Sequence, residues 1–440
     1  MTEVVASARQ VLEAQGLHGR SVCVGLSGGL DSVVLLHVLV ALREAFALRI
    51  SAIHVDHGLH PNAGKWAEFC VRLCETLAVP LKVERVTVPR ESGLGIEAAA
   101  RAQRYAVFEK MPADILLLAH HLDDQAETLL LQLLRGAGAP GLSAMPVERA
   151  LGAGGPQLVR PFLMLQRAQL EAFALANALD WIDDDSNQEL VYDRNYLRHT
   201  VLPLIEKRFP AYRSTLSRSG RNLADAAGLA AVLGEQDLAA LRVGDAIALD
   251  KARDWPVYRV LNVLRALFRH LGQKAPRRAV LVEAVRQAFE AGPQTQVRVD
   301  FGALSLRRYR GHLHVVKNLC VPGNWRAQWR GEPTMTLPPG LGELRFEQTQ
   351  GAGFSMSKLH GGMVNETFRT GGERMALGPG RPHRNLRNLF QDAGVPSWLR
   401  ERTPLLFCGE RLLFVPGLGA AAEFQAGPDE ASCHVEWANG

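Results

Sequence analysis

The chain has 440 residues, 47% of them apolar and 22% charged, which is typical of folded globular domains and excludes disordered, collagen-like and disulfide-stapled chains. Its length predicts about three domains. Fifty Lys and Arg against 45 Asp and Glu give a formal charge of +5, which permits a polyanionic partner without requiring one.

Membrane and secretion signals are not evident in the sequence. No apolar run approaches the roughly 20 residues that cross a bilayer, and the longest, 33–42, is interrupted by His37. The first residues lack an apolar signal core. The six cysteines are too scattered for a disulfide framework. We therefore expect a cytoplasmic protein with no membrane partner.

Short apolar runs alternate with helical patterns over residues 1–212. Strands that alternate with helices form βαβ units, so this region predicts an α/β domain with a parallel, Rossmann-like sheet. Such a sheet binds ligands at the carboxyl ends of its strands. The strands are expected at 21–26, 49–55, 81–86, 114–119 and 158–162, and the helices at 32–48, 66–77, 96–111, 123–134 and 167–178.

The rest of the chain predicts two smaller domains. Helical patterns followed by strand-like alternation indicate a mostly helical middle domain over 213–320. A stretch with Gly and Pro, 322–342, is typical of a linker. Residues 343–440 predict a small mixed α+β C-terminal domain. The middle helices are expected at 216–241, 256–270 and 277–290, the alternation at 297–316, and the C-terminal helix at 384–393.

A glycine-rich loop after the first expected strand is typical of a phosphate site. Backbone N–H groups freed by glycine, the start of a helix and two hydroxyls can bind anionic oxygens. Asp31 repels phosphate by itself, but it fits if it holds Mg²⁺. A plain strand-to-helix turn is the alternative, and no Walker A lysine follows. The loop is Ser27, Gly28, Gly29, Leu30, Asp31 and Ser32.

Two further polar fragments also follow expected strands. One, 119–128, contains His120, Asp124 and Glu127 and runs into a helix; the other is 54–58. Carboxyl ends of parallel strands share one edge, so a single cleft can collect all three fragments. The alternative for 119–128 is simple capping of the helix by Asp123.

These fragments carry a resemblance to known enzymes. The loop resembles the PP-loop of the N-type ATP pyrophosphatases, and the whole set resembles the tRNA(Ile)-lysidine synthetase family. The resemblance covers most of the chain and is weakest in the middle domain. It extends through 135–138, 159–162, 185–187, 194–203, 369–374 and 389–396.

The resemblance implies an ATP-dependent ligase that modifies tRNA. It implies that L-lysine is joined to the first-anticodon-position cytidine of isoleucine tRNA with anticodon CAU, through an adenylated cytidine, with release of AMP and pyrophosphate. ATP, Mg²⁺, L-lysine and this tRNA are the expected partners, and a homodimer is possible. Both smaller domains are expected to bind tRNA.

The resemblance also suggests roles for individual residues. The loop would bind ATP, Asp31 and Asp124 would hold Mg²⁺, and Glu127 would hold the lysine ammonium. The other expected residues are His120, Arg101 and Arg194 in catalysis, and Arg374, Arg384 and Arg387 at the tRNA, with Arg384 and Arg387 on one short helix. The chain departs from the family pattern at His60, where arginine is usual.

Other functions remain open at this point. A metal-dependent phosphoesterase could use His54, Asp56, His57, His120, His121 and Asp124, although their spacing matches no closed zinc pattern. A third possibility is a non-catalytic RNA-binding module whose ATP site is vestigial, and the intact loop 27–32 argues against it. Thiolating PP-loop enzymes are disfavoured because the chain has no Cys-x-x-Cys pair.

Arg101 and Arg104 lie three apart on one expected helix, and Arg194 and Arg198 lie four apart on another. Either pair could bind a phosphate or could equally lie on a solvated helix face, and the resemblance favours a function for Arg101 and Arg194 only.

Overall fold

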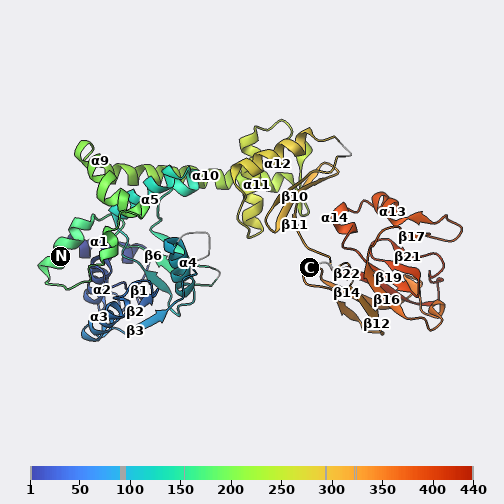
Figure 1. The fold of residues 1–440 in the computed structure, drawn as a ribbon, viewed down its shortest axis with the longest axis horizontal. Coiled ribbons are helices and arrows are strands. Elements are labelled where there is room, and N and C mark those ends of the chain that lie inside the picture. The colour runs from blue at the N-terminus through green and yellow to red at the C-terminus, as the bar shows by residue number, and fades with distance from the viewer. Residues whose placement is uncertain are drawn as a thin grey trace. The chain divides into compact units, whose positions relative to one another are not determined.

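The computed structural model describes residues 2–89, 96–152, 154–292, 295–321, 323 and 325–438, apart from the side chains of residues 97, 186 and 187. It divides into two compact units, 1–232 and 233–440, and the division falls within the long helix α10, Tyr212–Leu241 (Figure 1). The hydrophobic cores of the two units are separate, and the second unit contains two of them.

The first unit is built on one six-stranded sheet of order β3-β2-β1-β4-β6-β5. Five strands are parallel, which confirms the expected α/β class, and β5 adds an antiparallel edge that the sequence did not predict. The strands are β1 Ser21–Gly25, β2 Arg49–Asp56, β3 Leu81–Arg85, β4 Ile115–Leu117, β5 Glu148–Ala150 and β6 Gln157–Val159.

Helices cover both faces of this sheet. Val22 and Val24 of β1 point into a core formed with α1, α2, α3 and α7. Cys23 between them points into a second core with Phe108 of α4. This alternation is the period of two that a strand imposes, and burial on both faces explains the continuous apolar runs. The helices are α1 Glu3–Ala14, α2 Leu30–Leu42, α3 Ala63–Thr76, α4 Ile96–Phe108 and α7 Arg167–Ala176.

The expected helices are present with shifted ends. The largest shift is in α2, which ends at Leu42 instead of continuing to 48. The following turn, in which Ala47 has φ +49°, reverses the chain into β2. Helix α5 (Leu122–Leu134) matches the expected segment. The remaining segments up to α10 are α6 Ala139–Leu142, η1 Asp185–Gln188, α8 Asp193–Tyr196, the π-helical η2 Leu197–Val201 and α9 Leu202–Arg208.

The second unit begins with helices packed on an antiparallel sheet. Helices α11 (Val257–His270) and α12 (Arg278–Glu290) match expectation and share a core with a sheet of order β7-β8-β11-β10-β9. The middle region is therefore more mixed than the helical patterns alone indicated. Its strands are β7 Arg242–Val243, β8 Ala246–Ala248, β9 Arg298–Phe301, β10 Leu304–Tyr309 and β11 His312–Lys317, and η3 is Leu249–Ala252.

The C-terminal part contains two larger sheets and a two-stranded ribbon. The orders are β12-β16-β19-β20-β21, β13-β14-β22-β15 and β17-β18. The elements are β12 Arg326–Trp329, β13 Thr334–Thr336, β14 Glu343–Gln350, β15 Phe354–Ser355, η4 Ser357–Leu359, β16 Val364–Phe368, β17 Arg374–Met375, β18 Arg384–Asn385, α13 Leu386–Asp392, α14 Ser397–Arg400, β19 Pro404–Cys408, β20 Arg411–Val415, β21 Gly419–Ala420 and β22 Ala431–Ala438.

The stretch interpreted as a linker is partly structured. Within 322–342, β12 pairs with β16 and β13 pairs with β14. Both strands are short, and their Gly and Pro neighbours concealed them in the sequence. Among the helices that the structure describes, none has the length and apolar character to cross a membrane.

Candidate active site

The loop 27–32 leaves β1 and enters α2, as the motif predicted. The Ser27 and Ser32 hydroxyls lie 3.1 Å apart, and the Ser32 hydroxyl also donates to the Gly29 carbonyl at 2.9 Å. The Gly29 N–H lies 3.3 Å from the Ser27 hydroxyl. Leu30 is buried at the first position of α2. The two serines therefore shape the loop, and the helix start adds its positive dipole end.

Gly28 is required by the backbone and by its neighbours. Its φ is +88°, a region that residues with a Cβ avoid. A Cβ there would lie 2.5 Å from Ile182 Cδ1 and 3.3 Å from Cys70 Sγ. The Gly28 carbonyl also accepts a 2.9 Å hydrogen bond from the Ile182 N–H, which ties the segment after α7 to the loop.

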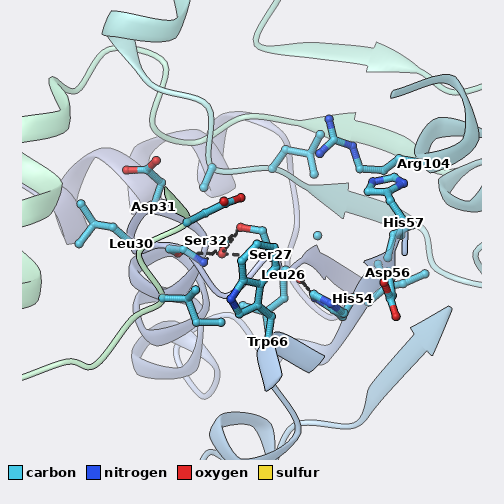
Figure 2. A pocket seen from close by; sticks show the side chains of 18 of the residues that line it. Leu26, Ser27, Leu30, Asp31, Ser32, His54, Asp56, His57, Trp66 and Arg104 are labelled. Carbon is cyan, nitrogen blue, oxygen red and sulfur yellow. Dashed lines mark hydrogen bonds between the residues drawn. The ribbon is translucent and has the colours of Figure 1, made fainter. Parts of the chain in front are cut away.

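One pocket of about 560 Å³ collects the three strand-end fragments. Figure 2 shows Ser27, Asp31 and Ser32 beside His54, Asp56 and His57, which come from the end of β2. Ala119, His120 and Asp124 line the same pocket from the third fragment. His60, at the position that departs from the family pattern, also lines it and stacks on Trp66 with ring centroids 4.5 Å apart.

His121 is the charge centre behind the loop. Its side chain is 1% exposed, and its Nε2 lies 3.6 Å from Asp31 Oδ2 and 3.4 Å from Asp124 Oδ2. Its Nδ1 lies 3.6 Å from Asp123 Oδ2. Burial alone would lower the pKa of His121, but the three carboxylates together raise it to about 10. The imidazolium thus compensates the acidic groups at the start of α5.

Arg194 and Arg198 occupy both oxygens of Glu127. Arg194 Nε donates to Oε2 and Arg198 Nε donates to Oε1, each at 2.6 Å, and the Glu127 side chain is 1% exposed. Arg194 also reaches Asp124 Oδ1 at 2.6 Å. Burial would raise the pKa of Asp124, but His121 and Arg194 lower it to about 2. The predicted residues Asp124, Glu127 and Arg194 are thereby brought together, with Arg198 added.

His120 is a neutral side chain at the pocket wall. Burial is the main cause that lowers its pKa to about 3. Its Nδ1 lies 3.2 Å from Arg160 Nε, which is always a donor, so Nδ1 accepts and the proton resides on Nε2. The tautomer follows from this hydrogen bond and makes His120 a hydrogen-bond donor toward the pocket.

Asp31 suits a divalent cation better than Asp124 does. Asp31 Oδ1 is buried and has no hydrogen-bond partner among the described residues. Both Asp124 oxygens already accept hydrogen bonds, Oδ1 from the Arg194 guanidinium and Oδ2 from the backbone N–H of His121 at 3.0 Å. Across the described residues, no group of three or more His, Cys, Asp or Glu side chains is arranged to hold a metal. Mg²⁺, however, commonly uses one or two carboxylates and completes its shell with phosphate and water.

A second pocket of about 550 Å³ adjoins the first. Both include His57, His60, His120, Asp124 and Arg198. The predicted residues Arg101 and Arg194 line only the second pocket, together with the aromatic ring of Tyr192. The two pockets therefore adjoin along a wall that includes His120 and Asp124.

The three arginines predicted at the tRNA lie in the second unit. Arg374 on β17 and Arg384 on β18 occupy paired strands, and all three side chains are exposed. Arg384 was expected beside Arg387 on one helix, and this is wrong because α13 begins only at Leu386. The Asn385 side chain caps that helix by accepting from the Arg387 N–H at 2.8 Å, which sets the start after Arg384.

Several site residues were missed from the sequence. Arg198 was left aside although its spacing of four from Arg194 placed both on one face. His121 was considered only as a metal ligand, although Asp123 and Asp124 stand two and three residues after it. Arg160 lies in the stretch 159–162 that resembles the family, but it was given no role, because its contact with His120 depends on the adjacency of β6 and β4.

Known families and proteins match nearly all of this chain. Families described as PP-loop domain, TilS substrate binding domain and TilS substrate C-terminal domain match residues 1–205, 253–314 and 364–437. A tRNA(Ile)-lysidine synthase of Nitrosomonas europaea is 39% identical over 97% of this chain and 93% of its own. One of Azoarcus sp. is 39% identical over 99% and 96%. Among solved structures, a TilS C-terminal domain is 21% identical, covering 26% of this chain and all of that one, with a TM-score of 0.22.

Proposed function

The chain belongs to the tRNA(Ile)-lysidine synthase family, and on this premise we propose that it joins L-lysine to the first anticodon cytidine of isoleucine tRNA with anticodon CAU. The single observation that carries the proposal is the pocket in which the PP-loop meets His120 and Asp124, two of the residues that also line a second pocket. ATP in the first pocket and the base in the second would meet at this boundary.

The first step transfers AMP to the base. The C2 carbonyl oxygen of cytidine attacks the α-phosphorus of ATP, an oxygen–phosphorus bond forms, and the bond to the β-phosphate breaks to release pyrophosphate. Charge grows on phosphate oxygens, which backbone N–H groups and hydroxyls of 27–32 would stabilise. The neutral His120 would donate a hydrogen bond from Nε2 to such an oxygen.

Asp31, assisted by Asp124, would hold Mg²⁺ next to these phosphates. The unpartnered Oδ1 of Asp31 supports this assignment, and the engaged oxygens of Asp124 make it the lesser ligand. When bound, the ion would withdraw charge from phosphate oxygens.

The second step replaces the activated oxygen by nitrogen. The neutral ε-amine of lysine attacks C2, the carbon–oxygen bond breaks, AMP leaves with that oxygen, and the amine loses its proton. Arg101 and Arg194 line the second pocket and would orient the substrates there. The contact of Glu127 with the lysine ammonium stays a prediction, and it requires Glu127 to exchange the arginines that now occupy its oxygens.

The remaining roles concern the tRNA and the assembly. We propose that the middle and C-terminal domains bind the tRNA body, with Arg374, Arg384 and Arg387 facing its backbone. Their exposed positions support this, and such contacts weaken as salt rises. A homodimer in the cytoplasm also stays a proposal, which sedimentation of the purified protein would test.

The decisive experiment measures labelled lysine incorporated into tRNA transcripts with ATP and Mg²⁺. Isoleucine and methionine CAU tRNAs are compared, using the wild type, Asp31→Asn and Arg20→Ala. Arg20 is exposed at the amino end of β1, away from the pocket, and serves as the matched control. We expect incorporation only into the isoleucine tRNA, a loss of at least 100-fold in Asp31→Asn, and wild-type rates in Arg20→Ala.

Two other outcomes would contradict the proposal in different ways. Pyrophosphate release that depends on tRNA, without lysine incorporation, would keep the adenylation step and exclude lysine as the nucleophile. Equal incorporation into both tRNAs would exclude the proposed substrate specificity.

A further inference from the structure

Three arginines from separate segments surround Tyr105 of α4. The guanidinium carbons of Arg101 and Arg149 lie 5.0 and 4.9 Å from the centroid of its ring. Arg101 also donates to the Tyr105 hydroxyl at 3.3 Å. Arg160, directly after β6, is buried, and burial lowers its pKa; Tyr105 opposes this shift, and Arg149 and Arg101 add smaller contributions that lower it further. We call Tyr105, Arg101, Arg149 and Arg160 the Tyr105 cluster.

The positive charge of this cluster is poorly compensated. Among the described side chains, no carboxylate forms an ion pair with Arg149 or Arg160; Arg160 instead contacts the Pro146 carbonyl at 2.7 Å, the neutral His120 and the Tyr105 hydroxyl. Glu148 precedes Arg149 on β5, so the two side chains point to opposite faces, and Glu148 pairs with Gln157. Like charges held together in this way favour an anionic ligand.

The cluster extends from the ATP pocket to the surface. Tyr105 lines the first pocket, Arg101 lines the second, and Arg160 holds His120, which lines both. Arg149 lines neither pocket and is exposed on the edge strand β5. The phosphates of ATP already have the loop 27–32, whereas an RNA strand that delivers a base to the second pocket would bring its backbone near Arg101, which lines that pocket, and near Arg149 beside it on the shared ring of Tyr105.

We propose that Arg149 and Arg101, stacked on Tyr105, bind a backbone phosphate of the RNA strand beside the nucleotide that is modified. A planar guanidinium suits this role because it can stack on a ring and still present two donors to a phosphate. Tyr105 is a positioning residue that orients both guanidiniums. The RNA substrate is taken from the proposed function, and the phosphate contact is an addition to it.

The test measures binding of the isoleucine CAU transcript without ATP at several salt concentrations, and binding of ATP without RNA. Arg149→Ala removes one exposed side chain, Arg149→Lys keeps its charge, and Arg20→Ala removes the same charge at the amino end of the inner strand β1, outside both pockets. We expect Arg149→Ala to weaken RNA binding about five-fold and to reduce the salt slope by about one, with ATP affinity unchanged. Arg149→Lys should recover about half of the loss, because it restores the charge without the stacking.

A second pair of variants tests the positioning by Tyr105. Tyr105→Phe keeps the ring and should bind RNA within about two-fold of the wild type, whereas Tyr105→Leu should resemble Arg149→Ala. Equal RNA affinity of Arg149→Ala and Arg20→Ala would overturn the proposal, and weaker ATP binding with intact RNA binding would assign the cluster to ATP. These affinities are read without catalysis, so failure of the wild type to incorporate lysine would count against the proposed function alone.

Discussion

Glu366 is a buried acidic side chain in the second unit. It lies on β16, its side chain is fully buried, and neither carboxylate oxygen has a hydrogen-bond partner among the described residues. Burial, with a smaller contribution from Glu332, raises its pKa to about 8. The group is therefore protonated in the folded protein at neutral pH and ionised in the unfolded chain.

This residue makes the second unit sensitive to alkaline pH. The folded pKa lies above the unfolded one, so its stabilising contribution is complete below about pH 4 and is lost as pH rises through 8. We expect the free energy of unfolding of the second unit to fall by about 2 kcal/mol between pH 6 and pH 9 from this group. Urea unfolding at both pH values measures the fall, and Glu366→Gln should remove it. An unchanged fall in that variant would show that another group causes it.

Gly28 and Gly29 form a matched pair for testing the loop. Gly28→Ala places a Cβ at φ +88° and 2.5 Å from Ile182, whereas at Gly29 the nearest atom is 3.5 Å away and φ is ordinary. We expect Gly28→Ala to cost about 2 kcal/mol or more and to lower the melting temperature of the first unit by about 5 °C. Gly29→Ala should change it by less than about 2 °C. Equal shifts would show that the positive φ is not what makes glycine necessary.

At the scale of elements, Glu127 joins α5 to α8 and η2. Both of its oxygens receive guanidinium donors, and Asp124 shares one of the arginines. Replacing one partner of such a buried group leaves the others without compensation. The network therefore holds two helical segments in fixed positions along the second pocket.

Glu127→Gln tests whether this carboxylate positions the arginines or binds lysine. We expect a loss of about 2 kcal/mol in stability and at least a ten-fold loss in tRNA-dependent pyrophosphate release, which precedes the attack by lysine. Glu171→Gln, an exposed change on α7, is the control. If only the KM for lysine rises while pyrophosphate release stays normal, Glu127 contacts the lysine ammonium directly.

Elements with a strong periodic signal were predictable and short ones were not. The apolar runs of β1 and β2 and the helical pattern of α5 were enough to predict these elements, because burial sets the spacing of apolar residues within each element. Strand β5 is three exposed residues, ERA, and depends on pairing with β6 rather than on its own pattern. The start of α13 after Arg384 was missed because the Asn385 cap outweighs the helical period.

At the scale of the molecule, the two units have separate cores. The core around α2 and β1 belongs to the first unit, and the cores around α11 and around β19 belong to the second. The site pockets lie entirely in the first unit. A ligand that binds only the folded first unit stabilises that unit alone.

Calorimetry of the full chain should therefore show two unfolding transitions. ATP with Mg²⁺ should raise the transition of the first unit by several degrees and leave the other within about 1 °C. Glu366→Gln at pH 9 should do the opposite and raise only the transition of the second unit. A single transition that moves as a whole with ATP would show that the units unfold together.

The site was predictable where its motif residues follow the carboxyl ends of parallel strands, which lie at one edge of the sheet. The placement of Ser27, His54 and His120 at one pocket follows from the parallel topology. The Tyr105 cluster was not predictable, because Arg149 and Arg160 reach it through β5 and β6, far from α4 in the sequence. Contacts between distant strands depend on the order of the sheet, which local patterns do not encode.

The π-helical turn η2 limits which insertions and deletions the segment 197–201 can tolerate. It carries Arg198 and lies between α8, which carries Arg194, and α9. A π turn holds one residue more than an α turn, so one deletion within 197–201 can be absorbed by closing it into a regular helix. Closing the π turn would rotate Arg198 away from Glu127 while preserving the fold. Insertions and deletions in this segment should thus abolish activity in chains that remain folded, and natural variation in length should gather elsewhere.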